Sequence, residues 1–490
     1  MASALIWIPL ALGGRALAGP VDLVGFGSPS MARAGGGVAL LDGAQGVFRN
    51  PALLQDMQAS QLAVGGWLLR GNLDPVQEVW WDTNRDGLVD DSDSPLQVDV
   101  QPDPADAIGV ALGRPIGERF GLAFAATLPV RRMLRIQTFE PSLPTYFFLD
   151  NRAQRFDMTL GFGWEQLPGL SVGGSVQVIA RARFTLDTTL DVTLRGATEG
   201  DEELGALVSE LTLDPHTMTL DIVPGLAPVA GLHWDVGELI PALDGLALAG
   251  NYRGSTGLPI DVDVDLQANL DLRDVGDLEP LGTTVLVPIH LAVFDHYLPA
   301  RWTMGAGWTS PDRFRAFVDL FHTRYAPMQI SVAHVVDTEV QSQLLQLPDP
   351  SVADGNPVTA TLRNTWSTKA GGEVYLPRWE PGRGIGWLQG VVRGGFGYEP
   401  SPLVAQGSTS ALLDADRLIL AGGLGVAHGA PFGLIEGPVS WDAHVQVHML
   451  GEGSLPVDTT TYRPGAPVDG GGVPIGGTLW SAGAQWSIDY

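Results

Sequence analysis

The last eleven residues of the chain, WSAGAQWSIDY at positions 480–490, alternate between two kinds of side chain. One face of this segment carries Trp480, Ala482, Ala484, Trp486, Ile488 and Tyr490. Because successive side chains of a β-strand point to opposite faces, this period of two predicts a strand with one apolar face. The same alternation recurs over residues 120–128, 156–164 and 439–449. A soluble β-sandwich and a transmembrane barrel both alternate in this way, so the pattern alone leaves both open.

Strand length and loop rhythm favour the barrel. Alternation continues for about 25 residues from Leu170 to Leu194, whereas strands of soluble proteins usually have roughly 5–6 residues. Short connections fall at 115–118, 167–169 and 310–312. The long polar stretches lie near 71–104, 196–215, 254–285, 333–360 and 452–476. Outer-membrane barrels have this rhythm of short periplasmic turns and long extracellular loops.

The C-terminal residue adds an independent signal. Tyr490 is aromatic and has apolar residues two and four positions before it, which resembles the assembly signal of bacterial outer-membrane proteins. We therefore predict an all-β fold, a transmembrane antiparallel β-barrel of about 14 strands over residues 58–490 with an N-terminal hatch, or plug, over 19–57. The predicted location is the bacterial outer membrane.

Composition limits the classes of function. The 490 residues carry 28 Lys and Arg against 55 Asp and Glu, a formal net charge of -27. This acidic balance argues against nucleic-acid binding, which needs a basic face. The chain has no cysteine, so neither disulfides nor thiolate metal sites contribute. The sequence contains no zinc-protease, serine-hydrolase or Walker motif, and we predict that the protein is not an enzyme.

The N-terminus has the features of a secretory leader. An apolar core over residues 4–12 precedes Ala16-Leu17-Ala18, a small-residue cleavage pattern. The usual basic residue before the core is missing, and a short buried helix is the alternative interpretation. We predict a signal peptide over residues 1–18.

Residues 20–56 do not alternate, and their small residues and short apolar pieces indicate a compact segment packed against something larger. They contain a Gly- and Ala-rich stretch over 25–37, then Asp42-Gly43-Ala44, then Asn50-Pro51-Ala52. This pattern resembles the N-terminal hatch of the FadL/TodX family of outer-membrane transporters for long-chain fatty acids and hydrocarbons. Similar segments follow at 107–129, 170–177, 298–305 and 397–423, so the resemblance covers essentially the whole mature chain.

The resemblance implies a passive channel for hydrophobic small molecules such as long-chain fatty acids or hydrocarbons. Such molecules would be captured among extracellular loops, pass a moving hatch and leave sideways near the third strand. Asn50, Pro51 and Ala52 would serve gating. Leu128 and Pro129 would mark the lateral opening, because Pro129 lacks the amide that a ladder bond needs.

The expected partners follow from the same resemblance. They are a hydrophobic ligand, outer-membrane lipid or lipopolysaccharide, and the barrel-assembly machinery during biogenesis, and the protein is expected to be a monomer. The alternative is a non-transporting barrel that acts as an adaptor or scaffold for partner proteins through its long acidic loops.

The first long loop contains a calcium-type motif over residues 82–93. Its spacing fits D-x-[DN]-x-[DN]-G, the pattern in which hard oxygen ligands surround calcium. The predicted ligands of Ca²⁺ are Asp82, Asn84, Asp86, Leu88 through its carbonyl, Asp90 and Asp93. A merely solvated acidic loop is the alternative.

Other residues are weaker candidates for ligand contact. Arg181 and Arg183 share the predicted lumen face and are candidates for holding an acidic headgroup, although arginines are also common in barrel lumens without binding a ligand. Arg131, Arg132 and Arg135 follow the third strand, where they would meet anionic lipid headgroups or form a solvated rim. The apolar residues 285–294 would line a capture groove or form the upper part of a strand.

Overall fold

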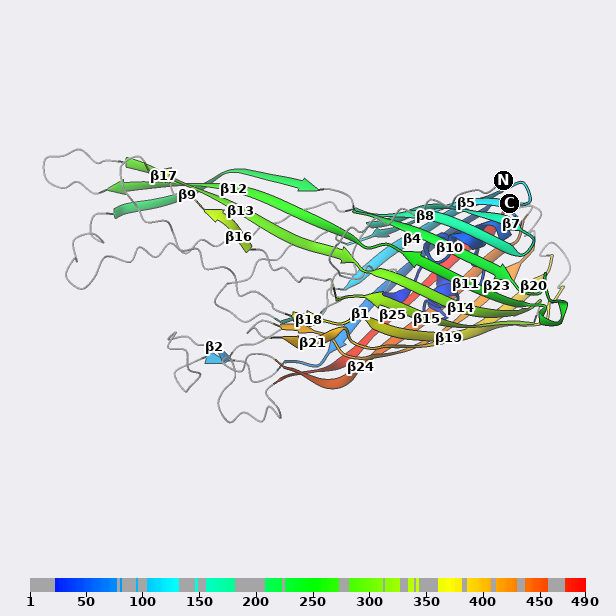
Figure 1. Ribbon diagram of the computed structural model, residues 1–490. Helices are drawn as coiled ribbons and strands as arrows, with labels where there is room; N and C mark the ends of the chain where they lie inside the picture. The colour runs from blue at the N-terminus through cyan, green and yellow to red at the C-terminus, as the bar shows by residue number, and fades with distance from the viewer. Residues whose placement is uncertain are drawn as a thin grey trace, which may run out of the picture.

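The structure is a computed structural model (Figure 1). It describes residues 23–76, 80–81, 94–95, 104–131, 146–148, 156–180, 208–222, 225–272, 282–311, 313–326, 334–338, 341–342, 360–380, 386–406, 411–429, 437–456 and 472–490. The predicted signal peptide over 1–18 lies outside these residues. Among the described residues, no helix is both long and apolar enough to cross a membrane.

Fourteen antiparallel strands close into a barrel, which confirms the predicted fold class. The strands are β1 (Gln61–Leu73), β4 (Ala105–Ile116), β5 (Phe120–Pro129), β7 (Phe156–Leu167), β8 (Leu170–Ala180), β10 (Gly225–Asp235), β11 (Leu246–Arg253), β14 (Ala300–Ser310), β15 (Phe314–Arg324), β19 (Thr365–Tyr375), β20 (Leu388–Glu399), β23 (Arg417–His428), β24 (Val439–Pro456) and β25 (Gly472–Asp489). The last strand closes the barrel by pairing with the first, with Trp486 opposite Val64.

The two ends of the barrel differ as the loop rhythm predicts. Tight turns join β4 to β5, β7 to β8 and β14 to β15 at one end, where the C-terminus also lies (Figure 1). At the other end a second sheet extends away from the barrel. It consists of β9 (Val208–Ile222), β12 (Thr256–Leu272), β13 (Gly282–Leu298), β16 (His334–Thr338) and β17 (Gln341–Ser342). By analogy with outer-membrane barrels, the short-turn end is periplasmic and the long-loop end extracellular.

The extracellular sheet corrects one expectation. Residues 254–285 were expected to form a polar loop, but the hairpin of β12 and β13 runs through most of this stretch. The apolar residues 285–294 belong to β13, which confirms the interpretation that they form part of a strand. Asp and apolar residues alternate in β12, and this period of two favours a strand even where the composition is polar.

Smaller elements complete the described fold. The short strands are β2 (Trp80–Trp81), β3 (Ser94–Pro95), β6 (Tyr146–Phe148), β18 (Ala360–Leu362), β21 (Leu403–Gln406) and β22 (Ala411–Leu413). The helical turns are α2 (Ser28–Met31), η1 (Gly43–Phe48), η2 (Pro51–Asp56) and η3 (Pro241–Leu243).

The outer wall of the barrel is apolar and carries two aromatic rows. Near the long-loop ends of their strands, the exposed aromatic residues are Trp302, Trp366, Tyr398 and Trp480. Near the short-turn ends they are Trp164, Trp308, Phe314 and Trp441. Exposed aliphatic residues fill the wall between the rows, among them Leu160, Val318, Leu424 and Val445. An apolar band between two aromatic rows is the surface of a barrel that spans a membrane, so this is an outer-membrane barrel.

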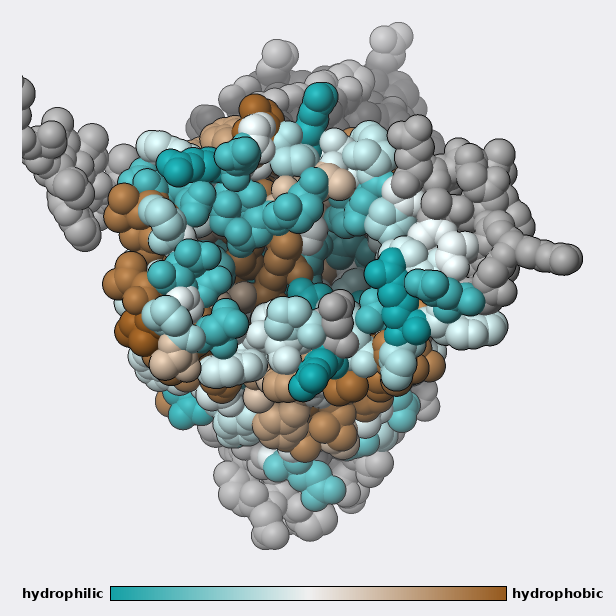
Figure 2. Space-filling model, turned by 90° about the vertical axis from the view of Figure 1, so that its right-hand side faces the viewer, coloured by the Kyte–Doolittle hydropathy of each residue, from teal (hydrophilic) through white to brown (hydrophobic). Residues whose placement is uncertain are grey.

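The hatch fills the barrel from within. Residues 23–57 are all buried or half-buried, and α2, η1 and η2 pack against the inner wall. Phe26, Val47 and Leu54 of the hatch form one apolar cluster with Ala111 and Ala125 of the wall. Figure 2, which looks onto the short-turn end, shows a hydrophilic rim around a hollow in which apolar side chains are visible. The hatch therefore occupies the path along the barrel axis.

Candidate functional site: the hatch and the barrel lumen

Asn50 fixes the hatch to the wall. Its side-chain oxygen accepts a hydrogen bond from the Ala52 amide at 3.1 Å and so caps η2, with Pro51 in the first turn where its missing amide costs nothing. Its Nδ2 donates to the carbonyls of Val38, within the hatch, and of Leu232, on β10, both at 3.1 Å. The three predicted gating residues thus lie together, fully buried, where the hatch joins the wall.

Glycines on the wall allow this close approach. A methyl group added at Gly231 on β10 would lie 2.1 Å from Asn50 Oδ1, and one at Gly173 on β8 would lie 2.4 Å from the Ala52 nitrogen. A methyl group added at Gly163 on β7 would lie 2.5 Å from the Pro51 carbonyl oxygen. Because a real Cβ does not approach another heavy atom this closely, any larger residue would push η2 away from the wall.

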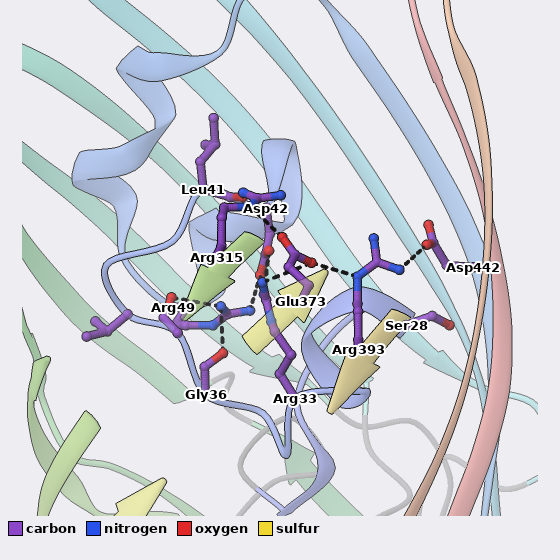
Figure 3. Close-up of polar contacts among 12 residues, drawn as sticks. Ser28, Arg33, Gly36, Leu41, Asp42, Arg49, Arg315, Glu373, Arg393 and Asp442 are labelled. Atoms are coloured by element: carbon purple, nitrogen blue, oxygen red, sulfur yellow. Dashed lines mark hydrogen bonds and ion pairs between the residues drawn. The ribbon is translucent and has the colours of Figure 1, made fainter. Parts of the chain in front are cut away.

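A buried ionic cluster lies on the opposite side of the hatch (Figure 3). Within the hatch, Asp42 is bound by Arg33 and Arg49, each at 2.5 Å. Arg33 also lies 3.6 Å from Glu373 on β19, and both side chains are at most 1% exposed. The cluster therefore joins the hatch to the wall by charge as well as by packing.

On the wall, Glu373 is the centre of the cluster. It pairs with Arg315 on β15 and with Arg393 on β20, the latter at 2.8 Å, and Arg393 continues to Asp442 on β24 at 2.5 Å. Arg315 also donates to the Leu41 carbonyl of the hatch at 3.0 Å. Four strands thereby contribute to one network that faces the hatch.

Charge balance in the hatch sets the protonation of Asp42. Burial by itself raises the pKa of the Asp42 carboxyl, but Arg33 and Arg49 outweigh burial and hold that pKa below its usual value. Asp42 therefore stays ionised at neutral pH and keeps both arginines in place.

Wall side chains of β15, β24 and β25 make further contacts with the hatch. Asp319 on β15 accepts hydrogen bonds from the amides of Gly37, at 2.6 Å, and Val38, at 3.2 Å. Gln485 on β25 accepts from the Ser28 amide at 3.0 Å, and the Ser28 hydroxyl lies 3.0 Å from His444 Nδ1. Asp319 and Gln485 thus satisfy three buried backbone donors of the hatch, and His444 adds a contact between two side chains.

A small cavity of about 70 Å³ remains between the hatch and the wall. Its lining includes three aromatic side chains and three cations, which are Phe26, Phe48, Phe321, Arg49, Arg253 and Arg301. Arg301 donates to Thr323 Oγ1 at 3.2 Å and its guanidinium lies 5.8 Å from the centre of the Phe321 ring. The cavity therefore offers an apolar surface and positive charge side by side.

The predicted lateral opening lies at the edge of a pairing. β5 pairs with β4 as far as Pro129, opposite Ala107, whereas its described pairing with β7 ends at Thr127, opposite Asp157. Leu128 faces outward and is 37% exposed, and Pro129 is buried. Both residues thus extend past the described β5–β7 ladder, and their role in exit stays a prediction.

The remaining predicted sites lie outside the described residues. These are the calcium-type loop with Asp82, Asn84, Asp86, Leu88, Asp90 and Asp93, and the headgroup candidates Arg181 and Arg183. The sequence interpretation did not single out Asp319, Glu373 or Arg393. A signal was present, because each is a charged residue inside an alternating strand, at a position whose chain neighbours are glycine or apolar.

Comparison with known proteins finds similar structures only. No protein-family profile and no curated protein matches the chain. Among solved structures it is similar to a FadL homologue of Pseudomonas aeruginosa, with 15% identity, a TM-score of 0.49, and coverage of 94% of this chain and 97% of that one. It is also similar to the CymD monoaromatic hydrocarbon channel (15%, 0.47, 96% and 98%) and to the P. putida toluene transporter TodX (11%, 0.47, 96% and 99%). The similarity concerns the fold, which the strand pairing establishes without it.

Proposed function

We propose that this barrel is a passive channel of the outer membrane that takes up hydrophobic molecules with an acidic headgroup, of which long-chain fatty acids are the simplest case. The observation that carries the proposal is the cavity beside the hatch. Arg253 and Arg301 would bind a carboxylate through charge-assisted hydrogen bonds, and Phe26, Phe48 and Phe321 would contact the chain that follows it. A pure hydrocarbon would contact only the aromatic part of this lining.

The size of the cavity supports a moving hatch. At about 70 Å³ it has room for a few water molecules, not for an alkyl chain. A ligand can fill it only after part of the hatch has withdrawn. Since η2 is seated among glycines of β7, β8 and β10, we propose that residues 25–42 move while η2 stays in place.

Sideways exit completes the proposed path. The hatch blocks the route along the axis, and Leu128 and Pro129 extend beyond the described pairing of β5 with β7. A proline has no amide to donate to a neighbouring strand, so a gap forms there at little cost. We place the exit into the membrane at this point.

Substrate choice is tested by uptake in a strain that lacks its own transporters. With Arg253→Gln and Arg301→Gln combined, we expect labelled fatty-acid uptake to fall roughly tenfold or more, because each lost charged hydrogen bond costs about 1.5–3 kcal/mol. Toluene uptake should stay unchanged. Arg324→Gln, which removes an exposed arginine at the end of β15, is the control.

The uptake results distinguish a headgroup-binding channel from a blocked channel and from an adaptor barrel. Equal loss of fatty acid and toluene would mean a blocked channel, and no loss of either would remove the headgroup role. If the barrel is instead an adaptor, neither compound depends on it, and the purified protein should carry partner protein in place of lipid.

A further inference from the structure

Three charged side chains meet on the outer wall of the barrel. They are Arg70 of β1, Asp106 of β4, and Arg131 just after β5. Arg70 Nη1 donates to one carboxylate oxygen of Asp106 at 2.6 Å, and Arg131 Nε lies 2.5 Å from the other. Two cations share one anion, so the cluster has a net charge of about +1 at neutral pH.

The cluster faces lipid, not the lumen. Asp106 shares its side of β4 with Ile108 and Leu112, both more than 40% exposed. Arg70 stands directly opposite Trp480, a member of the outer aromatic row. Aromatic rows mark the membrane–water interfaces of barrels, so the cluster lies at the headgroup level of the outer leaflet.

Arg131 is placed to bind an external anion. Its side chain is 57% exposed, and among the described residues its one ion pair is with Asp106. That contact uses Nε, while the two terminal nitrogens form the fork that matches a phosphate. At an interface of low dielectric constant, such an ion pair is stronger than in bulk water.

We propose that Arg70 and Arg131 bind the phosphate of a phosphorylated glycolipid in the outer leaflet, the chemistry of lipid A. The protein as a whole carries a net charge of -27 and repels such lipids, which makes a cationic site on the wall the point of contact. The lipid lies beside β5, next to the end of its pairing with β7. Its acyl chains therefore flank the surface where the proposed exit opens.

The test uses the full-length protein in detergent and native mass spectrometry. The probes are bis-phosphorylated lipid A and the same lipid with its phosphates removed. We expect wild-type protein to retain the phosphorylated form preferentially, and Arg70→Gln with Arg131→Gln to reduce its retention about 30-fold. Arg324→Gln, which removes an exposed arginine at the long-loop end of β15, should leave retention unchanged.

A second variant, which is expected to increase lipid retention, distinguishes a lost binding site from a misfolded protein. Asp106→Asn removes the anion that competes for both arginines and should strengthen retention. Weaker retention in Asp106→Asn, or equal retention by wild type and the double variant, would overturn the proposal. Displacement of the lipid by inorganic phosphate at millimolar concentration would identify free phosphate as the ligand and would equally overturn a lipid site.

Discussion

Removal of the Asp319 carboxylate should release the hatch without opening the barrel. Asp319 accepts hydrogen bonds from the buried amides of Gly37 and Val38, and its own side chain is 1% exposed. In Asp319→Ala both amides lose their partner while the hatch is closed, and each unsatisfied buried donor costs about 1–3 kcal/mol. The closed state therefore loses about 2–6 kcal/mol relative to a state in which water reaches these amides.

The expected population change is large. A loss of 3 kcal/mol, in the lower half of that range, raises the ratio of open to closed hatch roughly 150-fold, since every 1.4 kcal/mol is a factor of ten. The barrel should stay folded, because the strand pairing of β15 with β14 and β19 does not involve the side chain of Asp319.

Thiol labelling measures the hatch directly, because the chain has no cysteine. Ala39→Cys places a single thiol next to Val38 at a position that is 5% exposed, so a polar maleimide reaches it only when the hatch moves. Asp319→Ala should accelerate labelling by about two orders of magnitude. Ser481→Ala removes a buried lumen hydroxyl on β25 that has no hydrogen-bond partner in the described structure, and it should not change the rate. Equal labelling rates in Asp319→Ala and in the parent would refute the idea that these two hydrogen bonds hold the hatch closed.

Three further predictions concern the hatch and the first loop. Gly231→Ala places a methyl group 2.1 Å from Asn50 Oδ1 and should speed labelling of the same cysteine and lower the melting temperature, whereas Gly250→Ala, whose nearest neighbour lies at 3.9 Å, should do neither. The pKa of Asp42 lies below its usual value when the hatch is closed, so its contribution to closure is complete above about pH 5 and decreases progressively as the pH falls below about 4; labelling that instead rises between pH 8 and 6 would contradict this assignment. Calcium should protect residues 80–98 from limited proteolysis, read by mass spectrometry, and Asp82→Ala with Asp86→Ala should abolish the protection; cleavage indifferent to millimolar calcium would leave a solvated acidic loop.

The barrel was predictable because its determinants are local and repeated. Each strand carries its own period of two, as in residues 120–128, and each short connection at 115–118 or 167–169 appears directly in the sequence. The structure confirms 14 strands and these turns. The extracellular sheet was not predicted, because the polar composition of residues 254–285 places them among the long loops. The alternation of aspartates with apolar residues in β12 does favour a strand or hairpin, as the structure has it.

The lumen could not be predicted in the same way, because its contacts join residues hundreds of positions apart. Ser28 meets His444 and Gln485, and Gly37 meets Asp319, through pairings that only the closed barrel creates. Sequence alone does indicate which side chains face inward near the middle of a strand, since an isolated charge there, such as Asp319 between Val318 and Leu320, points away from lipid. It does not say which of the inward charges meet.

The hatch is held by different kinds of contact on its two sides. On one side, η2 is held by close contact of backbone with Gly163, Gly173 and Gly231, and such contact has no intermediate state between seated and displaced. On the other side, residues 33–42 are held by ion pairs and hydrogen bonds from β15 and β19. A carboxylate ligand that enters the cavity beside Arg49 competes for the same guanidinium that helps to hold Asp42. In the proposed channel, ligand binding would therefore weaken the polar side of the hatch and leave the glycine side intact. The hatch would then turn about η2, and its release would depend on an acidic headgroup.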